Sequence, residues 1–372
     1  MDAPPPSARQ ASRGPALVAL AVTAFILSAT GWLERIDHRV LDTAWRIVRS
    51  LGPGTAPVEI VVVGIDEATV REIPEPPGLW HDALARVFAR IAAAKPKAIG
   101  VDVPLPDRSF DHLRPGIDRT LMLGLAAARQ GAPLVASLAI DPASRGVRRI
   151  HAPLLAVLQE ERLGIGLVAR DVDGSARRFS IALPTEDGAF PTFAGRLCRA
   201  LSKRCTDGLI DYGHGPAVRV VPFQAVLGMN DLAALEGLFR DRVVLVGDTS
   251  AFGNRIPVPI NLAENESRSA QSSTIVVHAL SLRTALGEAP QDASRPLSML
   301  LASLPALLLL VRRPLPFALS ALAAAAGLAV ITVGALRHGV AVPVATAAVT
   351  LVLAALVVSY EAVRARPSKG AP

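Results

Sequence analysis

The chain has 372 residues, of which 51% are hydrophobic, 4% aromatic and only 19% charged. Soluble proteins usually carry about a quarter of charged residues, so this composition excludes disorder and indicates membrane-spanning segments. The net charge of +7 does not indicate nucleic-acid binding, because it is concentrated near the two ends of the chain. The middle segment 34–295 is nearly neutral, with 31 of the 39 basic and 30 of the 32 acidic residues.

Four apolar stretches are candidates for membrane spans. A helix needs about 20 residues to cross a hydrocarbon core about 30 Å thick. We therefore predict four transmembrane helices, at 15–33, 296–311, 314–336 and 339–360. The second stretch is short, and it would require bilayer thinning or a snorkelling arginine at its start. The first stretch has a second interpretation as a cleaved signal peptide, although it has no clear A-x-A cleavage site.

Basic residues predict the orientation of these spans, because Lys and Arg are enriched in cytoplasmic segments. A cytoplasmic N-terminus leaves only Arg337 in the short external loop between the last two spans. The basic residues that it places in the cytoplasm are Arg9, Arg13, Arg312, Arg313, Arg364, Arg366 and Lys369. We expect cytoplasmic tails at 1–14 and 361–372, an extracytoplasmic domain at 34–295, and a location in the inner (cytoplasmic) membrane.

The external segment alternates helical and strand patterns. It opens with an amphipathic helix at 34–51, which Gly52-Pro53-Gly54 ends. Runs rich in β-branched residues predict buried strands at 58–66, 98–103, 133–140, 164–168, 179–183 and 242–248. Helices are predicted at 81–94, 117–129 and 192–201, and a last one begins near 275–279. Strands that are apolar on both faces belong to parallel sheets covered by helices. We therefore predict an α/β domain with a mostly parallel, Rossmann-like sheet.

Three aspartates, Asp66, Asp102 and Asp248, each end a predicted strand. Ligands of open parallel sheets bind at the carboxyl ends of the strands, and carboxylates bind cations or polar groups there. The alternative is that each aspartate caps a following helix or accepts hydrogen bonds from loop amides. His278 has the same two interpretations, as a group that reaches the crevice or as a satisfied residue at a helix start. These four residues are the ligand-binding candidates.

Other site chemistries find little support in the sequence. Asp171-x-Asp173-Gly174 lacks the third ligand and the glutamate of a calcium loop, so it predicts a hairpin turn. No phosphate-binding loop, nucleophile elbow or His-Glu-x-x-His pair is present. We expect no catalytic residues, no metal, no cofactor and no enzymatic activity. The remaining enzymatic alternative is a metal-dependent hydrolase that uses the strand-end aspartates.

The two cysteines, Cys198 and Cys205, both lie in the external segment. An external compartment permits a disulfide bond between them, which would close a small loop. The alternative is two unpaired thiols near a helix, and the spacing does not decide between the two.

Six stretches together resemble a known family: LERIDHRVLDTAWRIVRS, VVVGIDEATV, AKPKAIGVDVPLPD, VDGSARRFSI, RDRVVLVGDTS and VVHAL. In this order, between about residues 33 and 286, and followed by three membrane helices, they are similar to the type-two CHASE domain. That domain is an extracellular sensor associated with bacterial cyclases and histidine kinases. The segment Pro76–Trp80 lacks the arginine of the family's Trp-Pro-Arg-like segment, so no ligand role is carried over to it. Only 12 residues follow Tyr360, too few for the cytoplasmic output domain common in the family.

The resemblance implies a membrane-anchored sensor that binds an unknown small ligand or envelope component and signals through its helices to a separate membrane protein or a second copy. Small residues recur on the third span and suit close helix contacts there, although they equally suit packing among the chain's own spans. These residues are Ala318, Ala321, Ala325 and Ala329. The alternative function is a structural or scaffolding envelope protein without ligand switching. Nucleic acid is not an expected partner.

Overall fold

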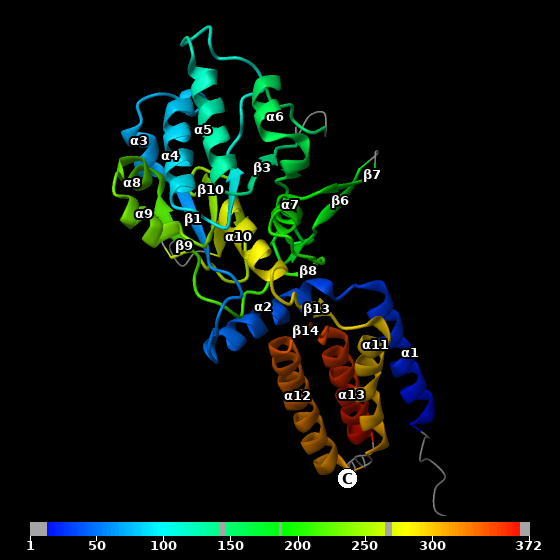
Figure 1. Cartoon of the computed structure of the whole chain (residues 1–372). Coiled ribbons are helices and arrows are strands. Elements are labelled where there is room, and N and C mark those ends of the chain that lie inside the picture. Colours follow the sequence, from blue (N-terminus) through cyan, green and yellow to red (C-terminus); the bar gives the residue numbers. More distant parts are fainter. Residues whose placement is uncertain (1–12, 141–145, 186–187, 265–269, 312, 365–372) are drawn as a thin grey trace, which may run out of the picture. The chain divides into compact units, whose positions relative to one another are not determined.

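The computed structural model describes residues 13–140, 146–185, 188–264, 270–311 and 313–364. The chain divides into two compact units (Figure 1). Residues 45–291 form an α/β unit, and residues 1–44 together with 292–372 form a helical unit. Most of the two predicted cytoplasmic tails, including Arg9, Arg366 and Lys369, lies outside the described residues.

A six-stranded parallel sheet forms the centre of the α/β unit (Figure 1). Its strand order is β4-β3-β2-β10-β1-β9. The strands are β1 (Ile60–Ile65), β2 (Ala98–Asp102), β3 (Leu134–Leu138), β4 (Leu163–Ile165), β9 (Arg219–Pro222) and β10 (Val243–Asp248). Val61, Val62 and Val63 are completely buried, as are their neighbours in β10, because helices cover both faces of the sheet. The parallel α/β sheet predicted from the β-branched runs is thus confirmed.

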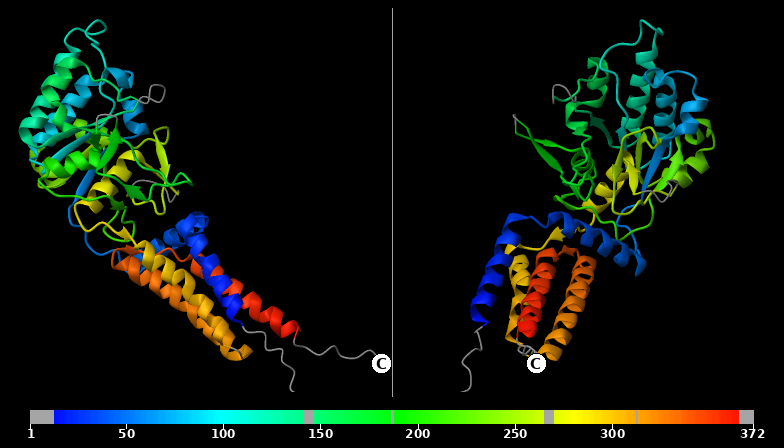
Figure 2. Two further views of the ribbon diagram at one scale, coloured as in Figure 1. Left: turned by 90° about the vertical axis from the view of Figure 1, so that its right-hand side faces the viewer. Right: turned by 180° about the vertical axis from the view of Figure 1, so that it is seen from behind.

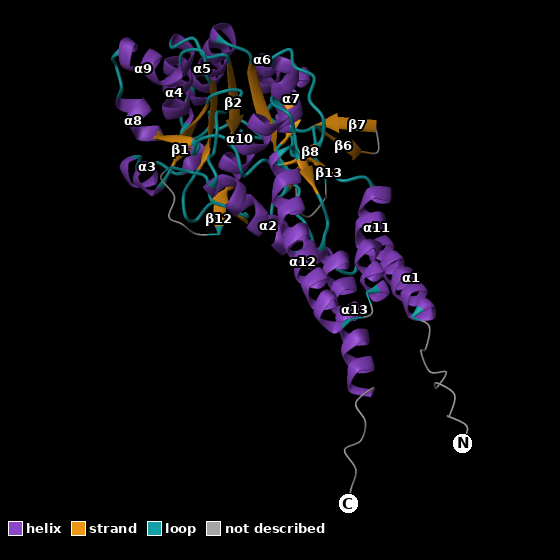
Figure 3. Ribbon diagram, turned by 90° about the horizontal axis from the view of Figure 1, so that it is seen from below, coloured by secondary structure: helices purple, strands orange, loops and turns teal. Residues whose placement is uncertain are grey.

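One face of the sheet packs against a large hydrophobic core shared by five helices (Figure 3). They are α4 (His81–Ala93), α5 (Ile117–Gly131), α6 (Ala152–Leu158), α8 (Phe223–Gly228) and α9 (Leu232–Phe239). Val87, Phe88 and Leu121 are among the fully buried residues of this core. Helix α3 (Glu67–Glu72) and the 3₁₀ turns η1 (Pro77–Leu79) and η2 (Glu160–Arg162) connect the larger elements.

The opposite face carries α7 (Phe193–Ala200) and α10 (Thr274–Ala285). These helices approach closely because glycines interrupt the central strands. A Cβ on Gly100 would lie 2.8 Å from the Phe193 ring, and one on Gly247 would lie 2.8 Å from the Ile275 side chain. Every residue from Ile275 to Ala285 is buried, so α10 lies inside the unit.

Short antiparallel pairs flank the main sheet. They are β5 (Arg178–Phe179) with β8 (Gly208–Leu209), β6 (Ala182–Thr185) with β7 (Gly188–Pro191), and β11 (Arg255–Pro257) with β12 (Gln271–Ser273). The single strand predicted at 179–183 is therefore divided between β5 and β6. A disulfide bond joins Cys198, in α7, to Cys205 in the following loop.

The helical unit contains α1 (Gly14–Thr30), α11 (Arg295–Ser303), η3 (Leu304–Leu310), α12 (Pro314–Arg337) and α13 (Ala345–Arg364). The helices of this unit lie side by side (Figure 2). Helices α1, α12 and α13 and the 3₁₀ helix η3 share a small apolar core that includes Leu20, Leu309, Phe317 and Ala354. Helix α2 (Glu34–Ser50) belongs to both units, because the boundary falls between Ala44 and Trp45. The short strands β13 (Gln291–Asp292) and β14 (Val340–Ala341) follow α10 and α12 along the chain.

Two helices, α12 and α13, are long and apolar enough to cross a membrane, and a third span exists if the bent pair of α1 and α2 counts as one. The prediction of four spans is therefore supported only in part. Helix α1 ends at Gly31, which has a left-handed backbone, and α2 turns away by 80°. The stretch 296–311 is interrupted, since α11 ends at Ser303 and continues as a 3₁₀ helix containing Pro305. Helix α13 begins at Ala345 rather than at Gly339, which also has a positive φ.

Polar contacts define the two ends of the helical unit. At one end, Arg13 forms an ion pair of 2.7 Å with Glu361 and donates to the carbonyl oxygen of Val311. At the other end, the Ala345 amide donates to Asp37 at 2.7 Å, and Ala293 donates to the carbonyl oxygen of Ala341. The chain leaves this unit after residue 44 and returns at residue 292, both near this second end.

Candidate functional site

Strands β1, β10 and β2 are neighbours and place the predicted aspartates at one edge of the sheet. In the strand register, Ile65 is opposite Asp248, and Gly247 is opposite Asp102. Asp66 follows β1 directly. All three side chains thus begin at the carboxyl edge of the sheet, where parallel α/β proteins bind their ligands. Their contacts nevertheless differ.

Asp66 is the N-cap of α3. Its Oδ1 accepts hydrogen bonds of 2.8 Å from both the amide and the hydroxyl of Thr69, and the Thr69 side chain returns to the Asp66 amide. This reciprocal arrangement is a capping box. Thr69 also bonds to the side chain of Gln224, at the start of α8. The carboxylate of Asp66 is therefore occupied by local backbone and side-chain donors.

Asp248 accepts a hydrogen bond of 2.7 Å from the amide of Ser250, two residues later. This contact is the loop-amide interaction typical of an aspartate in a turn. The Asp248 side chain is exposed, and Gly253 lies so close that a Cβ there would be 2.5 Å from its Oδ2. The carboxylate stabilises the loop between β10 and β11, with one oxygen on the Ser250 amide and the other against Gly253.

Asp102 and His278 lie together. Asp102 Oδ1 accepts a hydrogen bond of 2.5 Å from the Ser137 hydroxyl in β3. Its Oδ2 is 3.9 Å from His278 Nε2, which in turn is 3.3 Å from the carbonyl oxygen of Gly166. The His278 ring packs edge-on against Phe193, with ring centroids 5.3 Å apart, and the residue is only 5% exposed. The structure thus brings two of the four predicted residues together and adds Ser137 as a third.

A cavity of about 100 Å³ lies beside this group. Asp102, Ser137 and Gly166 form one part of its wall, and Arg148 and Arg149 form another. The cavity therefore presents a carboxylate, a hydroxyl and two guanidinium groups, which suits a ligand with both donor and acceptor groups.

The arrangement does not match that of a nucleophilic triad. In such a triad the histidine lies between the serine and the carboxylate, so that it takes the proton of the hydroxyl. Here the carboxylate of Asp102 lies between Ser137 and His278. The serine hydroxyl donates to a carboxylate, which holds it as a polar group in the wall. The geometry is therefore suited to binding.

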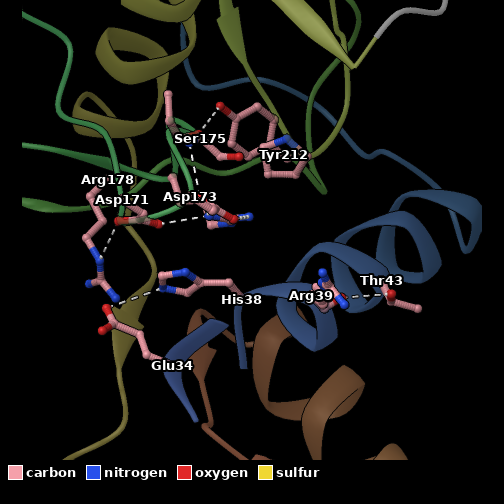
Figure 4. A network of polar contacts seen from close by, with 12 residues as sticks. Glu34, His38, Arg39, Thr43, Asp171, Asp173, Ser175, Arg178 and Tyr212 are labelled. Atoms are coloured by element: carbon pink, nitrogen blue, oxygen red, sulfur yellow. Dashed lines mark hydrogen bonds and ion pairs between the residues drawn. The ribbon is translucent and has the colours of Figure 1, made fainter. Parts of the chain in front are cut away.

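The carboxylates of the turn 171–174 form ion pairs with arginine side chains of the same chain. Arg177 is 2% exposed and pairs with Asp171 at 3.1 Å and with Asp173 at 2.8 Å. Arg178 approaches the other oxygen of Asp171 at 3.6 Å, as Figure 4 shows. Gly174, with a φ of 83°, allows the tight turn. The carboxylates that faintly suggest a calcium loop are neutralised by arginines. Residues 171–174 form a turn, as predicted, but the predicted hairpin is wrong, because β4 pairs with β3 and β5 pairs with β8.

A second polar cluster, which the sequence did not predict, lies at the starts of α4, α5 and α6. Asp118 is 5% exposed and accepts hydrogen bonds from the Phe110 amide. His81 Nε2 and His151 Nε2 face its two oxygens at 3.7 and 3.8 Å. Burial lowers the pKa of His81, and the charges of Asp118 and Asp111 oppose that change only in part. Its members are 33 or more residues apart in the chain, so only the fold reveals the cluster.

No group of three or more His, Cys, Asp or Glu side chains is arranged to hold a metal ion among the residues that the structure describes.

A comparison with protein families finds one match, the CHASE2 domain, whose family model covers residues 17–328. The match includes the whole α/β unit, with β1, β2 and β10 and the candidate residues at their ends. Neither the curated proteins nor the solved structures contain a match to this chain.

Proposed function

Since the chain belongs to the CHASE2 domain family, a family of sensory domains, we propose that it is a membrane-anchored extracytoplasmic sensor. In this proposal the α/β unit binds a small ligand or an envelope component outside the cytoplasm. The helical unit anchors the α/β unit in the inner membrane and transmits the conformational change that ligand binding causes. The observation that carries the proposal is the family match over 312 residues, from 17 to 328.

The two ends of the helical unit support an external position for the α/β unit. Arg13, Val311 and Glu361 lie at one end, and Arg313 follows Val311 two residues later in the chain. This basic end suits the cytoplasmic side. The chain departs for the α/β unit and returns from it near the opposite end, at residues 44 and 292. Residues 45–291 then belong on the external side.

Asp102, His278 and Ser137 are the ligand contacts that we propose at the carboxyl edge of the sheet. They line or adjoin the cavity that also contains Arg148 and Arg149. Asp66 and Asp248 have local partners, and in this proposal they support the neighbouring loops.

Helix α2 provides a route for the signal. It is continuous from Glu34 to Ser50, and the boundary of the two units falls within it. Trp45 and Val48 pack closely on Gly213 of the α/β unit, where a Cβ would lie under 3 Å from both. A ligand can shift the equilibrium between two conformations of the protein only if it binds one of them more tightly than the other. A change at this contact alters the same helix that continues into the helical unit.

A separate membrane protein or a second copy receives the signal in this proposal. Ala318, Ala325 and Ala329 of α12 are exposed, and Ala321 is half-buried. Small side chains allow close helix contacts in lipid. Replacing Ala321 and Ala325 by Leu is expected to weaken association in native membranes while sparing insertion. Crosslinking that captures only the monomer before and after the change would contradict the idea of a partner.

We further propose that the chain has no enzymatic activity of its own. The Asp102 carboxylate accepts a hydrogen bond from Ser137, and the Asp66 carboxylate accepts one from the Thr69 amide at the start of α3. A metal-dependent hydrolase would need several of these oxygens free to bind one ion.

Hydrogen exchange of the full chain in lipid nanodiscs tests the sensor function. The probe is a low-molecular-mass extract of cells that produce the protein. A sensor is expected to show protection in residues 45–291 and a change in α2 when the extract is added. A structural or scaffolding protein, the alternative function, is expected to exchange identically with and without it.

A further inference from the structure

A cavity of about 700 Å³ lies at the amino-terminal edge of the sheet, beside the starts of β1 and β9. The strands are parallel, so this edge is opposite the one that carries Asp102. Volumes of about 300–1,000 Å³ are typical of small-molecule sites. The segment 54–60 forms one wall, residues 216–219 form a second, and α10 contributes Ala279 and Arg283.

Arg283 is the most buried charged residue of this wall, with 6% exposure. Its Nη1 donates to the carbonyl oxygen of Pro216 at 2.6 Å, and its Nη2 donates to that of His214 at 3.0 Å. A guanidinium has five N–H groups. Within the described part of the chain, the other three N–H groups have no acceptor, and no carboxylate forms an ion pair with Arg283. Arg283 and its partner Pro216 both line the cavity, so N–H groups of the guanidinium remain for a ligand there.

Arg283 retains its charge in this setting. Burial is the main cause that lowers its pKa to about 10; Asp211 opposes this change, and the nearby Arg49 adds to it. At neutral pH the guanidinium is therefore protonated. A buried charge without a partner is unfavourable, and an anion that pairs with it removes part of that cost.

The other groups of the wall restrict the kind of anion. Glu59 pairs with Arg242 at 2.8 Å, whereas Glu264 is exposed and has no ion pair with any described residue. The exposed Arg219 of the same wall offsets the charge of Glu264, so the net charge of the wall is that of Arg283 and favours a singly charged anion. The remaining wall is largely aliphatic and suits an apolar body. It includes Val58, Ile60, Val218 and Ala279.

We propose that this cavity binds a small organic carboxylate, whose carboxylate group pairs with Arg283 and whose apolar part contacts the aliphatic wall. A guanidinium binds a carboxylate through parallel charge-assisted hydrogen bonds, which suits the three N–H groups that Arg283 has left. The inference rests on the proposed sensor function and names a class of ligand for it. The site is separate from the contacts at Asp102.

The test measures binding of benzoate and hexanoate to the full chain in lipid nanodiscs by isothermal titration calorimetry, with empty nanodiscs as the blank. Benzamide and hexanamide are the neutral counterparts. A carboxylate is expected to bind at least about tenfold more tightly than its amide, because a hydrogen bond to a charged group is stronger than a neutral one. Arg283→Met is expected to abolish that difference. Arg119→Met is the matched control and is expected to keep the difference, since Arg119 is an exposed arginine of α5 that does not line the cavity.

A second variant keeps the test decisive if Arg283→Met does not fold. Ala217→Phe narrows the cavity at a half-exposed position and leaves the guanidinium in place, so it is expected to weaken both carboxylates. Equal binding of acid and amide, unchanged binding in Arg283→Met or Ala217→Phe, or no binding of either carboxylate overturns the proposal. If the carboxylates fail while the cell extract still protects residues 45–291, only the ligand class is wrong and the sensor function stands.

Discussion

At the scale of single residues, the strand-end aspartates perform different tasks despite their equivalent positions in the sequence. Asp66 has the contacts of a helix cap, Asp248 those of a turn, and Asp102 those of a polar group beside a cavity. The position of each aspartate at the end of a predicted strand correctly places it at the carboxyl edge of the sheet. This position does not predict the hydrogen-bond partner of each carboxylate. Thr69 and Ser250 are brought close by the path of the following loop, and Ser137 by the order of the strands in the sheet.

Asp66→Ala is expected to lower the free energy of unfolding by about 1 kcal/mol, the usual cost of losing an N-cap. Denaturant unfolding followed by tryptophan fluorescence measures this change, since Trp45 and Trp80 are buried. The protection that the cell extract produces is expected to remain. Asp102→Asn is the comparison variant and is expected to weaken that protection. Loss of protection in Asp66→Ala at unchanged stability would instead make Asp66 a ligand contact.

His81 is expected to make the stability of the α/β unit depend on pH. Its pKa in the folded protein is lowered by burial, so the unfolded chain takes up the proton first as the pH falls. Stability should therefore decrease once the pH falls below about 6.5, the ordinary value for histidine. The groups that face His81 are Asp118 at 3.7 Å and the Phe110 ring, and His151 faces Asp118 from the other side.

The comparison of denaturation midpoints at about pH 7 and about pH 5 measures this effect. His81→Gln is expected to reduce the loss of stability between the two pH values. His112→Gln is the control, because His112 is exposed and stacks on Phe110. An identical loss in the wild type and in His81→Gln would contradict the account of this cluster.

At the scale of elements, hydrophobic patterns predict the central strands and the long helices well. The runs at 58–66, 98–103, 133–140 and 242–248 correspond to β1, β2, β3 and β10. The edge strand β9 was missed, because Arg219–Pro222 is short and ends in a proline. The apolar stretch 296–311 resembles a span in composition, but Pro305 interrupts its helix.

The packing of α4 on α5 depends on Gly124. A Cβ at this position would lie 2.3 Å from the Cα of Ala85, so the two helix backbones are in direct contact. Gly124→Ala gains helix propensity of about 1 kcal/mol but forces the helices apart, which typically costs about 1–3 kcal/mol. We expect a net loss of stability.

Gly237→Ala in α9 is the matched control, because the residue is exposed and no atom lies within 4 Å of the position that the added methyl group would take. It is expected to raise stability by up to about 1 kcal/mol. Denaturant unfolding compares the two variants. A stabilised Gly124→Ala protein would show that α4 and α5 adjust without strain.

At the scale of the whole molecule, an α/β unit is joined to a helical unit that contains the candidate membrane spans α12 and α13. The overall class was predictable, since composition indicates the membrane and strand patterns indicate the sheet. The two cavities were not predictable, because their walls combine residues from distant parts of the chain. Arg283 illustrates this limit: in the sequence it is one arginine of a helix, and only the packing of α10 shows that it is buried beside a cavity.

The central claim is that residues 45–291 lie outside the cytoplasm, and labelling of single introduced cysteines in intact cells tests it most directly. Arg119→Cys places a thiol at an exposed position of α5, whereas the native Cys198 and Cys205 are joined and do not react. Ser368→Cys places one in the C-terminal tail. We predict that a membrane-impermeant maleimide labels Arg119→Cys in intact cells and labels Ser368→Cys only after the membranes are opened. The reverse pattern would place the α/β unit in the cytoplasm and contradict the account.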